Sequence, residues 1–213
     1  MTIRTRFPRP VREIENMWIP MPDGARLAAR VWLPEDAEAN PVPALFELIP
    51  YRKSDGTTHR DSLRQPYYAG HGYAVVRVDL RGSGDSDGVL YDEYTVQEHD
   101  DAVAVIAWLA TQPWCDGNVG MMGISWGGFN SLQVAARRPP PLKAILIIGF
   151  TDDRYADDVH YMGGCVITSQ MLSWASVMFA YNALPPDPRW VGERWRPMWF
   201  ERLERSSPFV ETW

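Results

Sequence analysis

Cysteine is rare in this sequence of 213 residues, and histidine is nearly as rare. The two cysteines, Cys115 and Cys165, form no CxxC pair, and no histidine lies at metal-ligand spacing from either of them. These absences exclude a disulfide framework and a zinc site, so we expect two reduced, partly buried thiols. No other motif indicates a metal ion or an organic cofactor, and we expect neither.

Clusters of positive charge and long apolar runs are missing as well. The 21 lysines and arginines are scattered among 27 acidic residues, and the formal net charge of -6 excludes nucleic acid or an anionic membrane as a partner. The longest apolar runs, such as residues 144–150, are far shorter than the ~20 residues that span a bilayer, so we expect them to be buried strands. No apolar segment follows the basic N-terminus, and we therefore expect a cytoplasmic protein.

The sequence does contain a regular alternation of apolar segments with segments of helical periodicity. Asp23-Gly24 favours positive φ between two alternating segments, which predicts an antiparallel hairpin over residues 16–34. We then predict strands over residues 42–50, 73–80, 118–124 and 142–150, separated by helices over residues 62–72, 95–112 and 126–138. The predicted fold class is therefore α/β, with a mostly parallel sheet after an antiparallel N-terminal hairpin.

One serine stands where such a fold places its chemistry, at the carboxyl end of a parallel strand. Ser125 lies in "GISWGG", residues 123–128, and G-x-S-x-G between a predicted strand and a predicted helix is typical of a nucleophile elbow. Such a turn strains the serine backbone and exposes its hydroxyl, while the glycines let strand and helix approach each other. The alternative interpretation is an ordinary glycine-rich turn.

An acyl-transfer serine also needs hydrogen-bond donors aimed at the developing oxyanion. The backbone N–H of Trp126 is one candidate, because it follows the serine directly. Tyr51 in "PYRK", residues 50–53, is a second candidate, because it follows a predicted central strand and its phenol is a neutral donor at neutral pH. By its spacing alone, Tyr51 fits a half-buried packing role better than a catalytic one.

Five segments resemble the X-Pro dipeptidyl-peptidase and cocaine-esterase family of serine hydrolases, in the same order: "MPDGARLAARVWLP", "PYRK", "HGYAVVRVDLRGSGDSDG", "WLATQPWCDGNVGMMGISWGG" and "TDDRYADDVHYMGG". The resemblance implies an α/β-hydrolase core in which Ser125 is the nucleophile, and the Trp126 N–H and the Tyr51 hydroxyl form the oxyanion hole. The family usually has tyrosine where this chain has Trp126, but a backbone donor does not depend on the side chain. The loop at residues 81–88 is expected to be structural, since its glycines allow tight turns.

The resemblance further implies two parts. Residues 1–150 would be the N-terminal part of the catalytic domain, and residues 151–213 the beginning of a helical cap above the active site. Half of the tryptophans fall in this second part, where they suit either an apolar acyl pocket or plain packing of the cap: Trp174, Trp190, Trp195, Trp199 and Trp213.

A Ser-His-Asp triad in this fold takes its Asp and His from loops after the nucleophile, and neither residue is found. His59, His71 and His99 precede Ser125, so His160 is the only candidate substitute. The later strands and the family's C-terminal β-sandwich are absent too, so we expect an incomplete, N-terminal portion of a longer hydrolase. Its sheet would expose an apolar edge and favour association.

We therefore predict a serine hydrolase that cleaves a small-molecule ester, an amide or a short peptide through an acyl-enzyme on Ser125, and that is inactive as this truncated chain. Asp157 or Asp158 could hold a substrate ammonium, or both could belong to a solvated acidic loop. The alternative function is a non-catalytic, truncated hydrolase fold that acts as a binding module or has no independent function. No oligomeric state is predicted.

Overall fold

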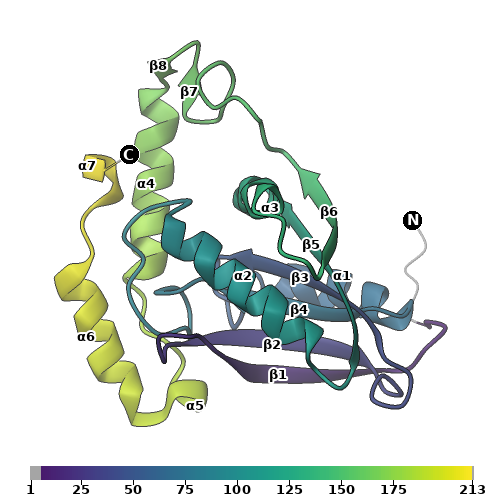
Figure 1. Cartoon of the computed structure of the whole chain (residues 1–213). Helices are drawn as coiled ribbons and strands as arrows, with labels where there is room; N and C mark the ends of the chain where they lie inside the picture. The colour runs from purple at the N-terminus through teal and green to yellow at the C-terminus, as the bar shows by residue number, and fades with distance from the viewer. Residues whose placement is uncertain (1–5, 213) are drawn as a thin grey trace.

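The computed structural model describes residues 6–212, and its centre is a sheet of six strands (Figure 1). The strand order across the sheet is β1-β2-β4-β3-β5-β6. β1 pairs with β2 and β2 with β4 in antiparallel fashion, while β4, β3, β5 and β6 pair in parallel. The predicted α/β fold is therefore confirmed. The strands are β1 Val11–Pro20, β2 Arg26–Pro34, β3 Val42–Ile49, β4 Ala74–Asp79, β5 Cys115–Ile124 and β6 Leu142–Ile148.

Three helices cover the two faces of this sheet (Figure 1). α1 Thr58–Gly70 packs against β2 and β4 on one face, whereas α2 Val96–Ala110 and α3 Trp126–Ala136 pack against β5 on the other. Thr95 caps α2 by accepting the N–H of Glu98, as a threonine before a helix commonly does. All three predicted helices are confirmed, with ends that differ from the prediction by a few residues.

Residues 151–212 form a small hairpin and a series of helices beside the sheet (Figure 1). The sequence predicts only helices here, so the small hairpin of β7 Tyr161–Met162 and β8 Cys165–Val166 is a correction. Gly163 and Gly164, both at positive φ, make its two-residue turn possible. Trp213 lies outside the described residues. The helices that follow are α4 Thr168–Asn182, α5 Pro188–Val191, a 3-10 turn at Gly192–Arg194, α6 Trp195–Arg205 and α7 Phe209–Thr212.

The two cysteines differ in burial. Cys115 at the start of β5 is buried, whereas Cys165 on β8 is exposed, so the prediction of two partly buried thiols is wrong for Cys165. Its two-residue strand has too little sheet around it to cover a side chain. Within residues 6–212, no group of three or more His, Cys, Asp or Glu side chains could hold a metal ion, and no helix is long and apolar enough to cross a bilayer.

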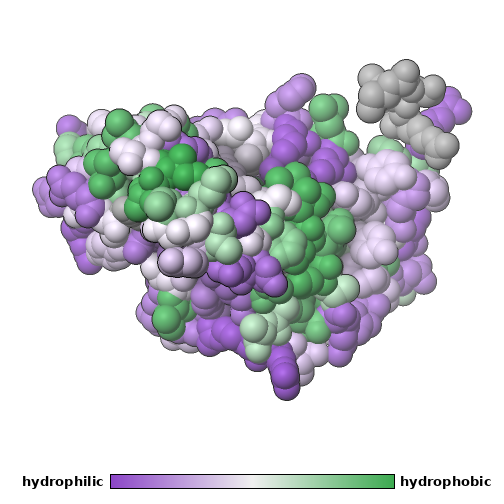
Figure 2. Space-filling view, turned by 90° about the horizontal axis from the view of Figure 1, so that it is seen from above, coloured by the Kyte–Doolittle hydropathy of each residue, from purple (hydrophilic) through white to green (hydrophobic). Residues whose placement is uncertain are grey.

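β6 ends the sheet, and among the described residues no strand pairs with its outer side. The prediction that residues 144–150 are a buried strand is wrong, because Leu146 and Ile148 are 52% and 53% exposed. Ile124 and Phe150 are exposed beside them, and Figure 2 shows a continuous hydrophobic strip on the face seen from above. An apolar run signals a strand but does not tell which neighbours will cover it. The expected apolar edge is thus present.

β5 and α3 approach each other so closely that position 123 requires a glycine. A Cβ on Gly123 would lie 2.2 Å from the carbonyl carbon of Gly127 and 2.3 Å from its Cα. Both atoms belong to the backbone, so no change of rotamer could relieve the contact. A Cβ on Gly127 would in turn lie 3.1 Å from Cγ2 of Ile49 in β3. The outer glycines of G-x-S-x-G therefore set the distance at which α3 starts from the sheet.

We expect Gly123→Ala to lower the free energy of unfolding by about 3 kcal/mol, the upper end of the usual cost of overpacking, because two backbone segments must move apart. Urea denaturation followed by circular dichroism measures this loss. Gly120→Ala is the matched control, since it adds the same methyl group to the same strand but meets only the end of the Leu45 side chain, at 3.2 Å. Equal losses in the two variants would contradict the interpretation.

Candidate active site

Ser125 lies on the turn between β5 and α3 with a φ of 55° and a ψ of -114°. A positive φ is unusual for a residue with a side chain and persists only where the surroundings enforce it. Here the Ser125 N–H donates to the carbonyl of Ile148 at 2.9 Å, and the Ser125 carbonyl accepts from the N–H groups of Gly128 and Phe129 at 2.7 and 2.9 Å. Ser125 is also exposed. The predicted geometry of a strained strand-turn-helix elbow is therefore confirmed.

Two cavities meet at this serine. The first, of about 120 Å³, is mostly aromatic and brings Ser125 together with both other predicted site residues, Tyr51 and Trp126; its remaining lining residues are Tyr94, Val159, His160, Gln170 and Trp174. The second, of about 180 Å³, continues from Ser125 toward Phe129, Gly149, Phe150, Thr151, Asp157, Asp158 and Val159. One tryptophan of the C-terminal part, Trp174, thus faces the site.

Tyr51 follows β3 at the same edge of the sheet as Ser125. Its ring meets the Trp126 ring edge-on at 6.4 Å between centroids, and it packs against Trp174 at 5.9 Å and Tyr181 at 6.4 Å. Burial raises the pKa of the Tyr51 phenol far above its ordinary value, although nearby Arg77 opposes this effect. The hydroxyl therefore stays protonated and able to donate throughout the neutral pH range.

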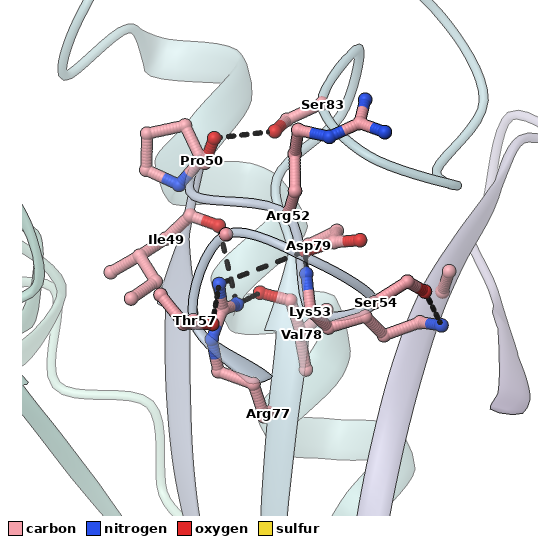
Figure 3. Close-up of polar contacts among 12 residues, drawn as sticks. Ile49, Pro50, Arg52, Lys53, Ser54, Thr57, Arg77, Val78, Asp79 and Ser83 are labelled. Carbon is pink, nitrogen blue, oxygen red and sulfur yellow. Dashed lines mark hydrogen bonds and ion pairs between the residues drawn. The ribbon is translucent and has the colours of Figure 1, made fainter. Parts of the chain in front are cut away.

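Two buried side chains fix the backbone on either side of Tyr51 (Figure 3). The carboxylate of Asp79 accepts the N–H of Lys53 at 2.7 Å, and the hydroxyl of Ser83 donates to the carbonyl of Pro50 at 2.7 Å. Asp79 is fully buried, and this burial raises the pKa of its carboxyl group. Because Asp79 ends β4 and Ser83 lies in the loop after it, the position of Tyr51 depends on the neighbouring strand.

Arg77 of β4 balances the acidic groups buried in this region. Its guanidinium lies 3.5 Å from Asp61, 3.7 Å from Asp79 and 3.9 Å from Glu47, and all four side chains are fully buried. It also donates to the carbonyl of Ile49 at 3.3 Å, just before the loop that carries Tyr51 (Figure 3). Such a cluster is stable only when its charges stay paired, so it holds the ends of β3 and β4 together.

The loop at residues 81–88 connects this region to the C-terminal helices. Arg202 of α6, which is fully buried, donates to the carbonyls of Gly84 at 2.9 Å and Ser86 at 2.5 Å. The loop's Asp85 accepts the N–H of Asp187 at 2.8 Å, just before α5. This geometry agrees with the structural role that the sequence predicts for the loop.

Glu98 of α2 lies beneath the elbow, inside the protein. Its Oε1 accepts from Nε1 of Trp126 and from Nδ2 of Asn130, both at 2.9 Å, and its Oε2 accepts the Tyr94 N–H at 3.0 Å. Burial is the main cause that raises the pKa of Glu98 to about 7, while these hydrogen bonds act to lower it. Glu98 carries no sequence signal of a site residue, because its one local pattern, Thr95-x-x-Glu98, is that of a helix cap.

His160 lines the first cavity, but its ring is already engaged. Its Nδ1 lies 3.2 Å from Oε1 of Gln170, and its Nε2 lies 3.6 Å from the carboxylate of Glu93. The structure thus brings the one histidine that follows Ser125 in the sequence close to the site, and holds it there by side chains of α4 and of the loop before α2.

The acidic segment at residues 152–158 is only partly solvated. Asp157 is exposed and borders the second cavity. Asp158 is buried and pairs with Arg154 at 2.7 Å, so the interpretation of a solvated loop is wrong for this residue. Arg154 also pairs with Glu93 at 2.6 Å and lies over the ring of Tyr94. These contacts hold the segment against the loop before α2.

Comparisons with known proteins agree with this fold. A sequence model of the X-Pro dipeptidyl-peptidase (S15 family) matches residues 23–213. Cocaine esterase from Rhodococcus sp. (strain MB1 Bresler) is 35% identical over 164 residues, which cover 76% of this chain and 28% of the esterase. A putative Xaa-Pro dipeptidyl-peptidase from Streptomyces avermitilis is 28% identical over 183 residues, or 71% of this chain and 27% of the relative.

Solved structures give the same result. A CocE/NonD family hydrolase from Staphylococcus aureus superposes with a TM-score of 0.69 at 22% identity, over 94% of this chain and 35% of the hydrolase. An α-amino acid ester hydrolase superposes with a TM-score of 0.63 at 25% identity, over 79% of this chain and 30% of that one. The chain has the α/β-hydrolase fold and spans about a third or less of each relative. Because the family match runs from residue 23 to residue 213, the protein belongs to the X-Pro dipeptidyl-peptidase (S15) family.

Proposed function

We propose that the chain carries the nucleophile and oxyanion hole of a serine hydrolase that cleaves ester or amide bonds through an acyl-enzyme on Ser125. The observation that carries the proposal is an exposed serine at positive φ, at the start of a helix, that shares one cavity with Tyr51 and Trp126. Family membership supports it, since the relatives named above include an esterase and a dipeptidyl-peptidase.

In this mechanism the Ser125 Oγ attacks the carbonyl carbon of the substrate, and the carbonyl oxygen becomes an oxyanion. The Trp126 N–H would stabilise that charge from the start of α3, where the helix dipole favours an anion. The Tyr51 hydroxyl would donate from the opposite side, and its raised pKa keeps the proton in place. The alcohol or amine then leaves with the proton that the Ser125 hydroxyl has given up to a base, and water adds to the acyl-enzyme, which restores the Ser125 hydroxyl and releases the acid.

The lining of the two cavities suggests how a substrate would lie. In this proposal the segment from residue 151 onward begins a cap, because Val159, Gln170 and Trp174 face Ser125 across the first cavity. The aromatic walls there favour an apolar acyl group. Asp157, exposed at the second cavity, is placed where it could attract the ammonium group of a peptide substrate. The substrate we propose is a small-molecule ester, an amide or a short peptide.

Few groups near Ser125 could act as the base that takes its proton. His160 is the only histidine that lines either cavity in residues 6–212, and its ring contacts Gln170 and Glu93. A serine hydroxyl without a base is a weak nucleophile near neutral pH. We therefore propose that the isolated chain does not turn over.

We expect the purified chain to show no steady-state hydrolysis of 4-nitroanilides, and at most one slow acylation per molecule by 4-nitrophenyl acetate. The elbow and oxyanion hole alone provide only about 10³- to 10⁴-fold acceleration, too little for an amide. Mass spectrometry of proteolytic peptides should place the acyl group on Ser125, and the folded variant Ser125→Ala should lack it.

Sustained turnover that Ser125→Ala abolishes would show that the chain supplies its own base, and His160→Ala would then test the source. Equal acylation of both variants would refute the proposed nucleophile and favour a binding module.

We expect Tyr51→Phe to slow the acylation of Ser125 by about 10²-fold, the usual cost of losing one oxyanion donor. The loss should be found at every pH of the neutral range, because the phenol remains protonated. Tyr181→Phe is the matched control, since it removes a hydroxyl from the same aromatic cluster but does not line the cavity. Stopped-flow release of nitrophenolate measures both rates. If Tyr51→Phe behaves like Tyr181→Phe, the role of Tyr51 is packing.

A further inference from the structure

One buried carboxylate links the two parts of the fold that supply the proposed oxyanion donors. Glu98 holds the indole of Trp126, whose N–H is the first donor. It also holds the side-chain amide of Asn130, and the same Nδ2 donates to the carbonyl of Leu48 at 2.7 Å. Leu48 lies in β3, three residues before Tyr51, whose hydroxyl is the second donor. A single side chain of α2 thereby connects the elbow to the end of β3.

We propose that Glu98 is a positioning residue for the oxyanion hole. Through the indole of Trp126 and the amide of Asn130, Glu98 sets the spacing between the Trp126 N–H and the Tyr51 hydroxyl. This inference rests on the proposed function. Glu98 itself does not line the cavity at Ser125, and so it acts only through the residues that it holds.

The cost of burying this carboxylate argues against a role in packing alone. An apolar side chain of similar size would fill the space without desolvating a charge. The charge of Glu98 is balanced by three N–H donors, from Trp126, Asn130 and Tyr94. Glutamine cannot satisfy all three, because its NH₂ group would face a donor whichever way the amide is turned. Only the carboxylate presents an acceptor to every one of them.

Ionisation of Glu98 should therefore be visible at the elbow. The titratable and charged groups around Glu98 come from several elements. Glu93 and Tyr94 precede α2, Tyr51 follows β3, and Arg154 follows β6. Arg81 and Arg205 line a neighbouring cavity of about 290 Å³ that Glu98 also borders. With its pKa near 7, Glu98 becomes charged as pH rises through neutrality. Its hydrogen bonds to Trp126 and Asn130 strengthen when it does.

The first test follows the indole and backbone N–H resonances of Trp126 in the tryptophan-labelled chain by NMR, with Trp126→Phe used for assignment. We expect both resonances to shift with a midpoint near pH 7, the pKa that the buried carboxyl group has in this environment. In Glu98→Gln neither should show this shift. If the Trp126 resonances of Glu98→Gln coincide with those of the wild type across the pH range, the inference is overturned, whatever the catalytic result.

The second test compares the rate of Ser125 acylation by 4-nitrophenyl acetate in the wild type and in Glu98→Gln as a function of pH. The ratio of the two rates cancels ionisations that both proteins share. We expect a ratio near one in mild acid that rises to about tenfold in mild base, within the range that misplacement of a catalytic group costs. A ratio that stays constant while Ser125 is still acylated would overturn the inference.

Asp101→Asn is the matched control, because Asp101 is also a buried acid of α2 but pairs with Arg81, at 2.7 Å, rather than with the elbow. This variant should lose thermal stability and keep the pH dependence of the wild type. A merely structural role of Glu98 would make the two variants alike, which would contradict the proposal. If Ser125→Ala is acylated like the wild type, the proposed function fails instead, and the NMR titration still reports whether Glu98 controls the elbow.

Discussion

The buried carboxylate of Asp79 is the contact on which the carboxyl edge of this sheet depends. It accepts the N–H of Lys53 from the loop after β3 and, at 3.3 Å, the N–H of Asp85 from the loop after β4. Gly84 passes so close that a Cβ there would lie 2.1 Å from Oδ2 of Asp79. Both loops are thus folded around one side chain. The loop that carries Tyr51 and the loop that receives the C-terminal helices share this support.

The proposed active site is assembled from neighbours of β3 in the sheet. Tyr51 follows β3 itself and is held by groups of β4, whereas Ser125 and Trp126 follow β5 and are held by the Gly123–Gly127 contact and by Glu98. Because β3 lies between β4 and β5, these two supports meet at the end of one strand. The geometry of the site is therefore a property of the central sheet, and Val159, Gln170 and Trp174 of the later segment line its cavity.

The features that could be predicted from the sequence are those with local signals. Asp23-Gly24 marks a hairpin, and G-x-S-x-G marks the elbow, because each depends on residues a few positions apart.

Glu47 and Arg77 give no such signal: each is one charged residue within an apolar strand, and only the pairing of β3 with β4 places them side by side. Glu98 is similar, since a capping pattern accounts for it until the fold brings Trp126 and Asn130 to its carboxylate. The apolar run around Leu146 gives no local signal of its exposure. Only the expected absence of later strands indicates that an apolar edge will be left uncovered.

Arg202 has a consequence for how the loop at residues 81–88 can vary. The guanidinium contacts backbone carbonyls of Gly84, Ser86 and, at 3.4 Å, Gly88, so it recognises the path of the chain and not the identity of its side chains. Gly82, Gly84 and Gly88 keep that path by their positive φ. Substitutions that preserve the curvature keep all three acceptors in place for Arg202. A single residue that straightens the loop would remove all three acceptors together, and the anchor would fail as a unit.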